Sequence, residues 1–289
     1  MTISSDPLLI QSAAYTEGAQ RGARYLLGLS ARSVQGEPVP PGLDQELPRQ
    51  GMEPQQVLAL MDQLGAGSTV ATAAGRYFGY VIGGALPAAS GARAMLTAWD
   101  QIADVLTGPS VLKMEEVALR WVVDLLGLPS QTAGAFTSGA TMANLTLLIT
   151  ARDTLLARQG HPRGRGLIGA PRLRIVASAE IHATVLKSLR MAGLGSDDIC
   201  FVPVNDQGQM QLDQLPPLDA STIVIAQVGN VCTGAADPIG ALAARCQAAG
   251  AWLHVDGAFG LWMRAGNSDL AAACTGLEQA DSWVGDAHK

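Results

Sequence analysis

Acidic and basic side chains follow two apolar runs near the end of the sequence. The first run, AWLHV at 251–255, leads directly into Asp256, and the second, at 282–285, leads into the segment DAHK at 286–289. A run of strand formers that closes on an acid is typical of a buried parallel strand with the acid at its carboxyl end. Because open α/β sheets bind ligands off that edge, these side chains indicate a ligand site there.

From residue 134 onward, strand-like and helix-like segments alternate. A short strand followed by a long helix is expected within 134–160, and Pro238 in the first turn favours a helix at 238–249. Alternation of this kind implies right-handed crossovers and a mainly parallel sheet. The further segments are strands at 173–178, 199–204, 221–228 and 251–256, and a helix at 182–192.

The first part of the sequence has a different character. Residues 15–29 and 54–64 carry apolar side chains at helical spacing, and a proline-rich connector at 37–51 lies between them. We therefore expect an N-terminal helical segment over 1–70 and a large α/β domain over 71–289.

Several ordered motifs carry a resemblance to a known family. HVDGAFG at 254–260 and DSWVGDAHK at 281–289 resemble the group II amino-acid decarboxylases, which depend on pyridoxal 5'-phosphate (PLP). The similarity runs from about residue 75 to the end. It implies the large domain of a fold-type I PLP-dependent transferase, a mainly parallel sheet flanked by helices.

The resemblance gives roles to the residues of these motifs. Asp256 is expected to pair with the pyridine nitrogen of PLP, Ala258 to lie against the ring, and Lys289 to hold the cofactor as a Schiff base. PLP accepts electrons while its ring nitrogen stays protonated, and a buried carboxylate favours that charged form. His288 is assigned to the phosphate and Asp286 to the network beside it. The preceding His254 is expected only to pack.

A small-residue turn at 138–141 lies between a predicted strand and a predicted helix. Such a turn presents backbone N–H groups to an anion, although an ordinary Ser/Thr cap has the same pattern. The resemblance assigns the PLP phosphate to Gly139, Ala140 and the Thr141 hydroxyl. It likewise stacks His182 on the PLP ring, where it reaches the substrate, whereas a lone histidine at this place is otherwise a helix cap or a core residue.

The loop GNVCTGAADPI at 229–239 departs from the family pattern GTT-x-x-GA-x-DPI. Asn230 and Val231 replace the two hydroxyl residues, so a polar contact to the cofactor or substrate is lost or is supplied by Asn230. Asp237 is expected to tie a turn.

The glycine-rich stretch 75–101 is expected to be a loop packed on the core. Its beginning, RYFGYVIGGALP, resembles the family segment near the substrate side of the pocket. That resemblance nominates Tyr80 and Val81 as substrate contacts.

The implied activity is that of a carboxy-lyase that converts an L-amino acid to an amine and CO2. An aminotransferase or another PLP lyase remains an alternative, because these enzymes share the cofactor residues. A catalytically silent fragment that acts only in protein interaction is a second alternative. We expect the sequence to be a fragment that ends on its Schiff-base lysine, with the C-terminal part absent; it is expected to be inactive alone and a homodimer when full length.

Composition excludes other classes. A net charge of −6 and a pI near 5.2 disfavour a nucleic-acid partner, and no apolar run is long enough to predict a membrane span or a secretory signal.

GRGLIG at 164–169 matches G-x-G-x-x-G without following a strand or opening a helix, so it predicts no nucleotide site. The spacing of the four cysteines predicts neither a metal site nor a disulfide, which favours the cytoplasm.

Overall fold

The computed structural model describes residues 6–42, 46–47, 49–102, 104–197 and 199–289. The chain divides into two compact units. One contains the residues up to Ile102 together with His288 and Lys289, and the other contains Ala103–Ala287.

The larger unit is built on a five-stranded sheet in which all paired strands are parallel. The spatial order is β2-β1-β3-β4-β5, so the chain crosses over between β2 and β3. The predicted α/β class with a mainly parallel sheet is confirmed. The strands are β1 (Arg174–Ser178), β2 (Cys200–Val202), β3 (Thr222–Gln227), β4 (Trp252–Gly257) and β5 (Ser282–Gly285).

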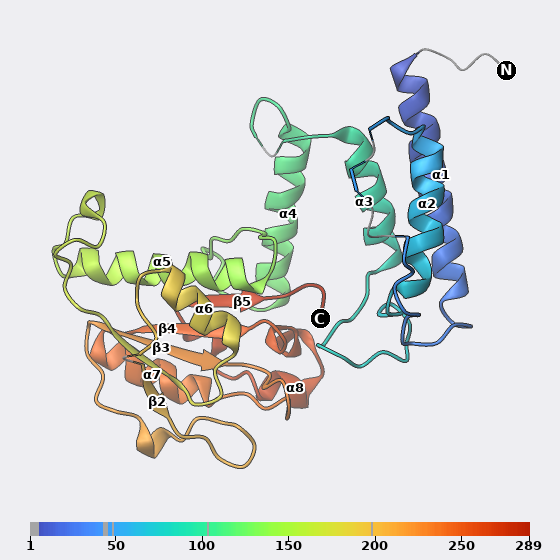
Figure 1. The fold of residues 1–289 in the computed structure, drawn as a ribbon. Coiled ribbons are helices and arrows are strands. Elements are labelled where there is room, and N and C mark those ends of the chain that lie inside the picture. Colours follow the sequence, from blue (N-terminus) through green and yellow to red (C-terminus); the bar gives the residue numbers. More distant parts are fainter. Residues whose placement is uncertain (1–5, 43–45, 48, 103, 198) are drawn as a thin grey trace. The chain divides into compact units, whose positions relative to one another are not determined.

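Helices cover both faces of this sheet (Figure 1). Leu148 and Leu155 of α5 pack with Ile223 and Ile225 of β3 on one face. On the other face, residues of α7 pack with alternate residues of the same strands. Burial on both faces explains why the strands read as nearly continuous apolar runs. The helices are α4 (Pro109–Leu125), α5 (Ala140–Arg158), α6 (Ala183–Met191), α7 (Ile239–Ala249) and α8 (Ser268–Ala272), with short 3-10 turns at Arg163–Arg165, Leu212–Gln214, Leu261–Ala265 and Leu277–Gln279.

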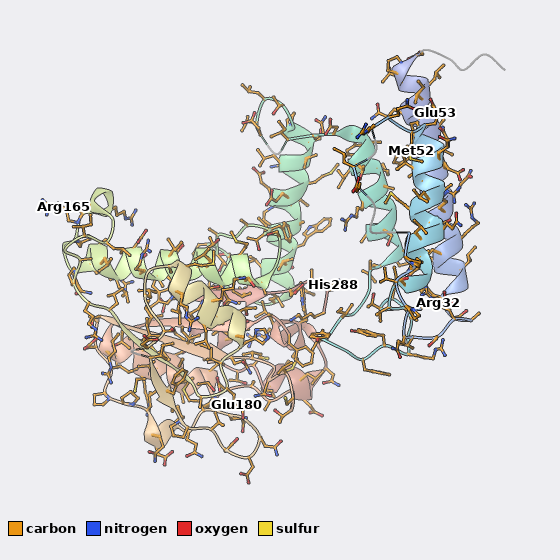
Figure 2. The ribbon with its side chains drawn as sticks, in the orientation of Figure 1. Arg32, Met52, Glu53, Arg165, Glu180 and His288 are labelled. Carbon is orange, nitrogen blue, oxygen red and sulfur yellow. The ribbon has the colours of Figure 1, made fainter. Side chains whose placement is uncertain are left out.

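The smaller unit is helical. Its elements are α1 (Pro7–Gly28), α2 (Pro54–Gly65), a 3-10 turn (Ala66–Ser68) and α3 (Pro87–Trp99), and α1 lies beside α2 (Figure 1). The guanidinium of Arg32, which Figure 2 labels, donates hydrogen bonds to the carbonyl oxygens of Ala66, Gly67 and Thr69, at 3.0, 3.0 and 2.6 Å. These bonds tie the segment after α1 to the 3-10 turn that follows α2.

Two local expectations are wrong. The stretch 75–101 is not a loop throughout, because Pro87 begins helix α3. The strand expected just after residue 134 is absent, and residues 133–137 form no regular element. The division into two compact units after Ile102 does not by itself define domains. The expected domain boundary between residues 70 and 71 therefore stays a prediction.

Candidate cofactor site

The candidate site begins at the carboxyl end of β4. Asp256 is 6% exposed and is the register partner of Gln227 on β3 and of Val284 on β5. Side chains alternate between the faces of a strand, so Asp256 shares its face with Trp252 and His254. Trp252 packs in the core cluster that contains residues of α5, which places Asp256 on the α5 face of the sheet.

Asp256 also shapes the turn that follows it. Its Oδ1 accepts a hydrogen bond from the backbone N–H of Ala258 at 3.1 Å. Ala258 is half-buried. A buried carboxylate of this kind is suited to hold a cationic ring nitrogen.

The N-terminus of α5 lies on the same face. Gly139 precedes the helix with φ 152°, a conformation that L side chains rarely adopt, and a Cβ there would meet nothing within 4 Å. The backbone N–H groups of Met142 and Ala143 both donate to Gly139 O, at 3.0 and 3.1 Å. The N–H groups of Ala140 and Thr141 precede that ladder, which is the arrangement that binds anions at helix N-termini.

His182 is the N-cap of α6. Its Nδ1 lies 2.7 Å from Thr184 Oγ1 and accepts from the Thr184 N–H at 3.3 Å. The ring is exposed. The capping alternative is therefore realised, and Nε2 is the ring atom left to face a ligand. Stacking of this ring on the cofactor stays a prediction.

The loop that departs from the family pattern is held by its own polar groups. Asn230 is 2% exposed, and its Oδ1 accepts from the N–H groups of Cys232 and Thr233 at 2.9 and 3.2 Å. Its Nδ2 donates to Glu180 Oε2 at 2.5 Å (Figure 2 labels Glu180). These contacts give Asn230 a role inside the loop, while its contact with the cofactor stays a prediction.

Asp237 ties this loop to two neighbours, which confirms its structural role. Its carboxylate accepts from the backbone N–H groups of Met210 and Gln227, each at 2.7 Å. Burial raises the pKa of Asp237 to about 6, against the opposing effect of these two bonds.

The residues after β5 fall into both units. In the larger unit, Asp286 is half-buried and its backbone oxygen accepts from Trp262 Nε1 at 2.9 Å. In the smaller unit, His288 O accepts from the Gly83 N–H at 3.0 Å, and Lys289 is exposed.

Tyr80 and Val81 also belong to the smaller unit, and both have φ 55°. Left-handed backbone is unusual for non-glycine residues, above all for β-branched valine. Such conformations concentrate at ligand sites. This geometry fits the nomination of both residues as substrate contacts, which stays a prediction.

Gln227 is a candidate that the sequence reasoning missed. It is the last residue of β3, lies beside Asp256 in the register and is half-buried. The signal was present, because Gln227 is the polar residue that closes the apolar run TIVIAQ, as Asp256 closes its own run.

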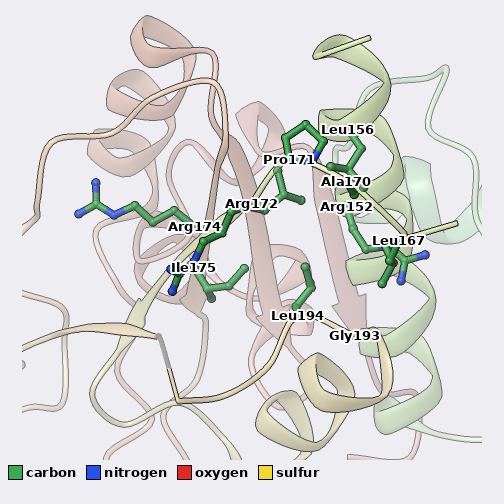
Figure 3. Close-up of a pocket in the computed structure, with 11 residues that line it drawn as sticks. Arg152, Leu156, Leu167, Ala170, Pro171, Arg172, Arg174, Ile175, Gly193 and Leu194 are labelled. Carbon is green, nitrogen blue, oxygen red and sulfur yellow. The ribbon is translucent and has the colours of Figure 1, made fainter. Parts of the chain in front are cut away.

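A separate cavity of about 620 Å³ lies at the opposite edge of the sheet, by the start of β1 (Figure 3). Its arginines bind protein atoms: Arg152 donates to Asp153 Oδ1 at 2.8 Å and to Ala192 O, and Arg174 donates to Pro217 O at 2.7 Å. Figure 3 shows the guanidinium groups of Arg152 and Arg174 pointing apart. They do not converge on a common ligand, so this cavity is not the candidate site.

The larger unit therefore has groups suited to two parts of PLP. A helix N-terminus suits its phosphate, and a buried carboxylate at the end of a neighbouring strand suits its ring nitrogen. A parallel sheet covered by helices, with these groups at its carboxyl edge, is the arrangement expected of a PLP-binding α/β protein of fold type I.

Comparison with known families agrees. Residues 69–289 match the pyridoxal-dependent decarboxylase conserved domain, and the chain belongs to that family. The cofactor of the family is PLP, as the motifs predicted.

The relatives that this chain matches are named for different substrates. L-2,4-Diaminobutyrate decarboxylase of Acinetobacter baumannii is 30% identical over an alignment of 212 residues, and the match covers 67% of this chain and 40% of that protein. Tryptophan decarboxylase 1 of Oryza sativa subsp. japonica is 31% identical over an alignment of 206 residues, and the match covers 63% of this chain and 38% of that protein. The chain thus spans about two-fifths of the length of these relatives.

Solved structures share the fold over nearly the whole chain. The apo form of mouse CSAD superposes with a TM-score of 0.85 and 26% identity, and covers 98% of this chain and 62% of its own. Oryza sativa TDC with PLP and tryptamine has a TM-score of 0.82 and 21% identity, covering 100% of this chain and 62% of its own.

None of the helices within the described ranges has the length and apolar character needed to cross a membrane.

Proposed function

We propose that this chain carries the cofactor-binding part of a PLP-dependent carboxy-lyase, which releases CO2 from an L-amino acid and forms the amine. The observation that carries the proposal is buried Asp256 at the end of β4, on the face of the sheet that α5 covers. When bound, PLP supplies the electron sink for the electrons left behind as the carboxylate departs.

The chain's own residues would hold and orient the reactants. The N-terminal turn of α5 (Gly139, Ala140, Thr141) would hold the phosphate, and Asp256 would hold the ring nitrogen in its protonated form. Ala258 would lie against the ring and His182 over its other face. Asp286 and His288 would serve the phosphate side, with Asn230 as a further cofactor contact, and the Lys289 amine would form the covalent link. Tyr80 and Val81 would lie on the substrate side.

The substrate is an L-amino acid whose side chain the residues above do not specify. Relatives named for diaminobutyrate, tryptophan and cysteine sulfinic acid are about equally similar to this chain. Incubation of the holoenzyme with a panel of L-amino acids, followed by detection of CO2, amine and keto acid, tests the reaction. Stoichiometric CO2 and amine are expected, and a keto acid without CO2 would identify an aminotransferase instead.

The proposed assembly is a homodimer and the proposed location is the cytoplasm. Exposed apolar side chains on α1 and α2, among them Leu8, Leu27 and Met61, support burial against a second copy. Cys246 and Cys274 are buried free thiols, which suits a reducing compartment. Light scattering of the purified holoenzyme should give twice the mass of one chain.

A further inference from the structure

A buried chain of hydrogen bonds joins α5 to β4 and β5. His254 Nε2 lies 2.8 Å from Asn144 Oδ1, and His254 Nδ1 lies 2.8 Å from Ser282 Oγ. Trp252 Nε1 donates to the same Ser282 Oγ at 2.9 Å. His254 and Asn144 are both 0% exposed, so water does not compete for these bonds.

The partner atoms fix the direction of every bond. A carboxamide oxygen only accepts, so Nε2 of His254 carries the proton and donates to Asn144. Nδ1 is then an acceptor and takes the Ser282 hydroxyl hydrogen, while the serine oxygen accepts from Trp252. Burial lowers the pKa of His254 to about 4, which keeps the ring in this neutral form.

Among the described residues, this contact is the one hydrogen bond that the Asn144 carboxamide makes. Its Nδ2 is buried and has no hydrogen-bond partner among the described residues. Leaving such a donor unpaired is costly. The hydrogen bond to His254 is therefore what holds the Asn144 carboxamide in its orientation.

The link spans the two halves of the cofactor site. Asn144 lies about one turn into α5, just after Gly139 and the first helical N–H groups. His254 lies two residues before Asp256 on the same face of β4. One hydrogen bond thus connects the helix whose end faces the phosphate with the strand that carries the carboxylate.

We propose that His254 is a positioning residue, which through Asn144 sets the spacing between the α5 N-terminus and Asp256 and so tunes the site to the phosphorylated cofactor. The inference rests on the proposed function. It gives His254 a role beyond packing.

Paired substitutions separate positioning from folding. His254→Asn keeps a polar atom towards Ser282 but is too short to reach Asn144, whereas His254→Gln places an amide near the position of Nε2. Asn144→Ala removes the other end of the link, and Ser282→Ala is the matched control because it alters the same network without touching that link. Apoenzyme of each variant is titrated with PLP and with pyridoxal, which lacks the phosphate.

His254→Asn and Asn144→Ala should lower affinity for PLP about tenfold, the equivalent of one hydrogen bond, while affinity for pyridoxal stays within about twofold. His254→Gln should restore most of the PLP affinity, and Ser282→Ala should leave the ratio of the two affinities unchanged. If His254→Asn does not fold, Asn144→Ala decides the same comparison. Wild-type apoenzyme that fails to bind PLP would refute the proposed function, whereas an unchanged ratio in both link variants, with wild type binding PLP, would overturn this inference alone.

Discussion

Asn230 donates a hydrogen bond to Glu180 at 2.5 Å, and this bond joins the loop after β3 to the loop that carries His182. A Cβ on Gly208 would lie 2.5 Å from Asn230 Nδ2 and 2.7 Å from Glu180 Oε2, so a third loop packs closely against the pair. The residue that departs from the family pattern is thus part of the framework at the carboxyl edge of the sheet.

Asn230 and Glu180 should contribute unequally to stability. Asn230→Ala removes buried bonds to its own loop and should cost about 2 kcal/mol, whereas Glu180→Ala should cost less than about 1 kcal/mol because water reaches the exposed site. Urea unfolding measures both, with Glu180→Gln as the control that keeps an acceptor. Equal losses would show that the bond itself, rather than the Asn230 turn, holds the loop.

Asp256→Asn should retain PLP but lose most turnover. A neutral amide does not hold the ring nitrogen protonated, so the rate should fall by about 10² to 10⁴, a barrier increase of several kcal/mol. CO2 release and the cofactor absorbance are measured on the same sample. Unchanged turnover would remove Asp256 from the mechanism.

The buried histidine predicts how stability depends on pH. The unfolded state takes up a proton on His254 below its ordinary pKa near 6.5, while the folded state does not until about pH 4. The stability of the wild type relative to His254→Gln should therefore be constant above pH 6.5 and fall by up to about 3 kcal/mol as the pH drops towards 4. Urea unfolding of both proteins between pH 4.5 and 7.5 gives this difference in the free energy of unfolding. The contributions of other titrating groups, such as Asp237, largely cancel in it. A flat difference would contradict the neutral, buried state of the ring.

Because the backbone is left-handed at Tyr80 and Val81, we predict that Val81→Gly weakens substrate binding without lowering the stability of the fold. Val81→Gly relieves about 1 to 2 kcal/mol of strain and loses about 1 kcal/mol through the freer unfolded chain, so stability should change little. If Val81 contacts the substrate, KM should rise while kcat changes less. Steady-state kinetics and thermal unfolding test this together, and Val70→Gly, at an exposed residue with ordinary backbone, is the control.

Much of the sheet could be predicted because its strands are buried on both faces. The apolar runs at 173–178, 221–228 and 251–256 form β1, β3 and β4. Asp256 lies at the carboxyl end of β4, as predicted. β2 is shorter than predicted, with only Cys200–Val202 paired, and it ends before residue 203 because its partner β1 ends at Ser178.

Other features could not be read from local pattern. Helix α3 has a small-residue, glycine-containing sequence that reads as a loop, although Pro87 at its first turn was an available signal. The bond between Asn144 and His254 joins residues 110 positions apart, so only the folded topology brings them together. The same is true of Glu180 and Asn230, whose pairing explains a departure that sequence alone left open.

The most direct test of the central claim is to locate the covalent link. The lysines of this sequence are Lys113, Lys187 and Lys289, so a peptide map distinguishes them fully. Borohydride reduction of the holoenzyme, followed by mass spectrometry, should find the phosphopyridoxyl group on Lys289, and Lys289→Ala should lose it while remaining folded. A label on Lys113 or Lys187, or an undiminished label in Lys289→Ala, would contradict the account.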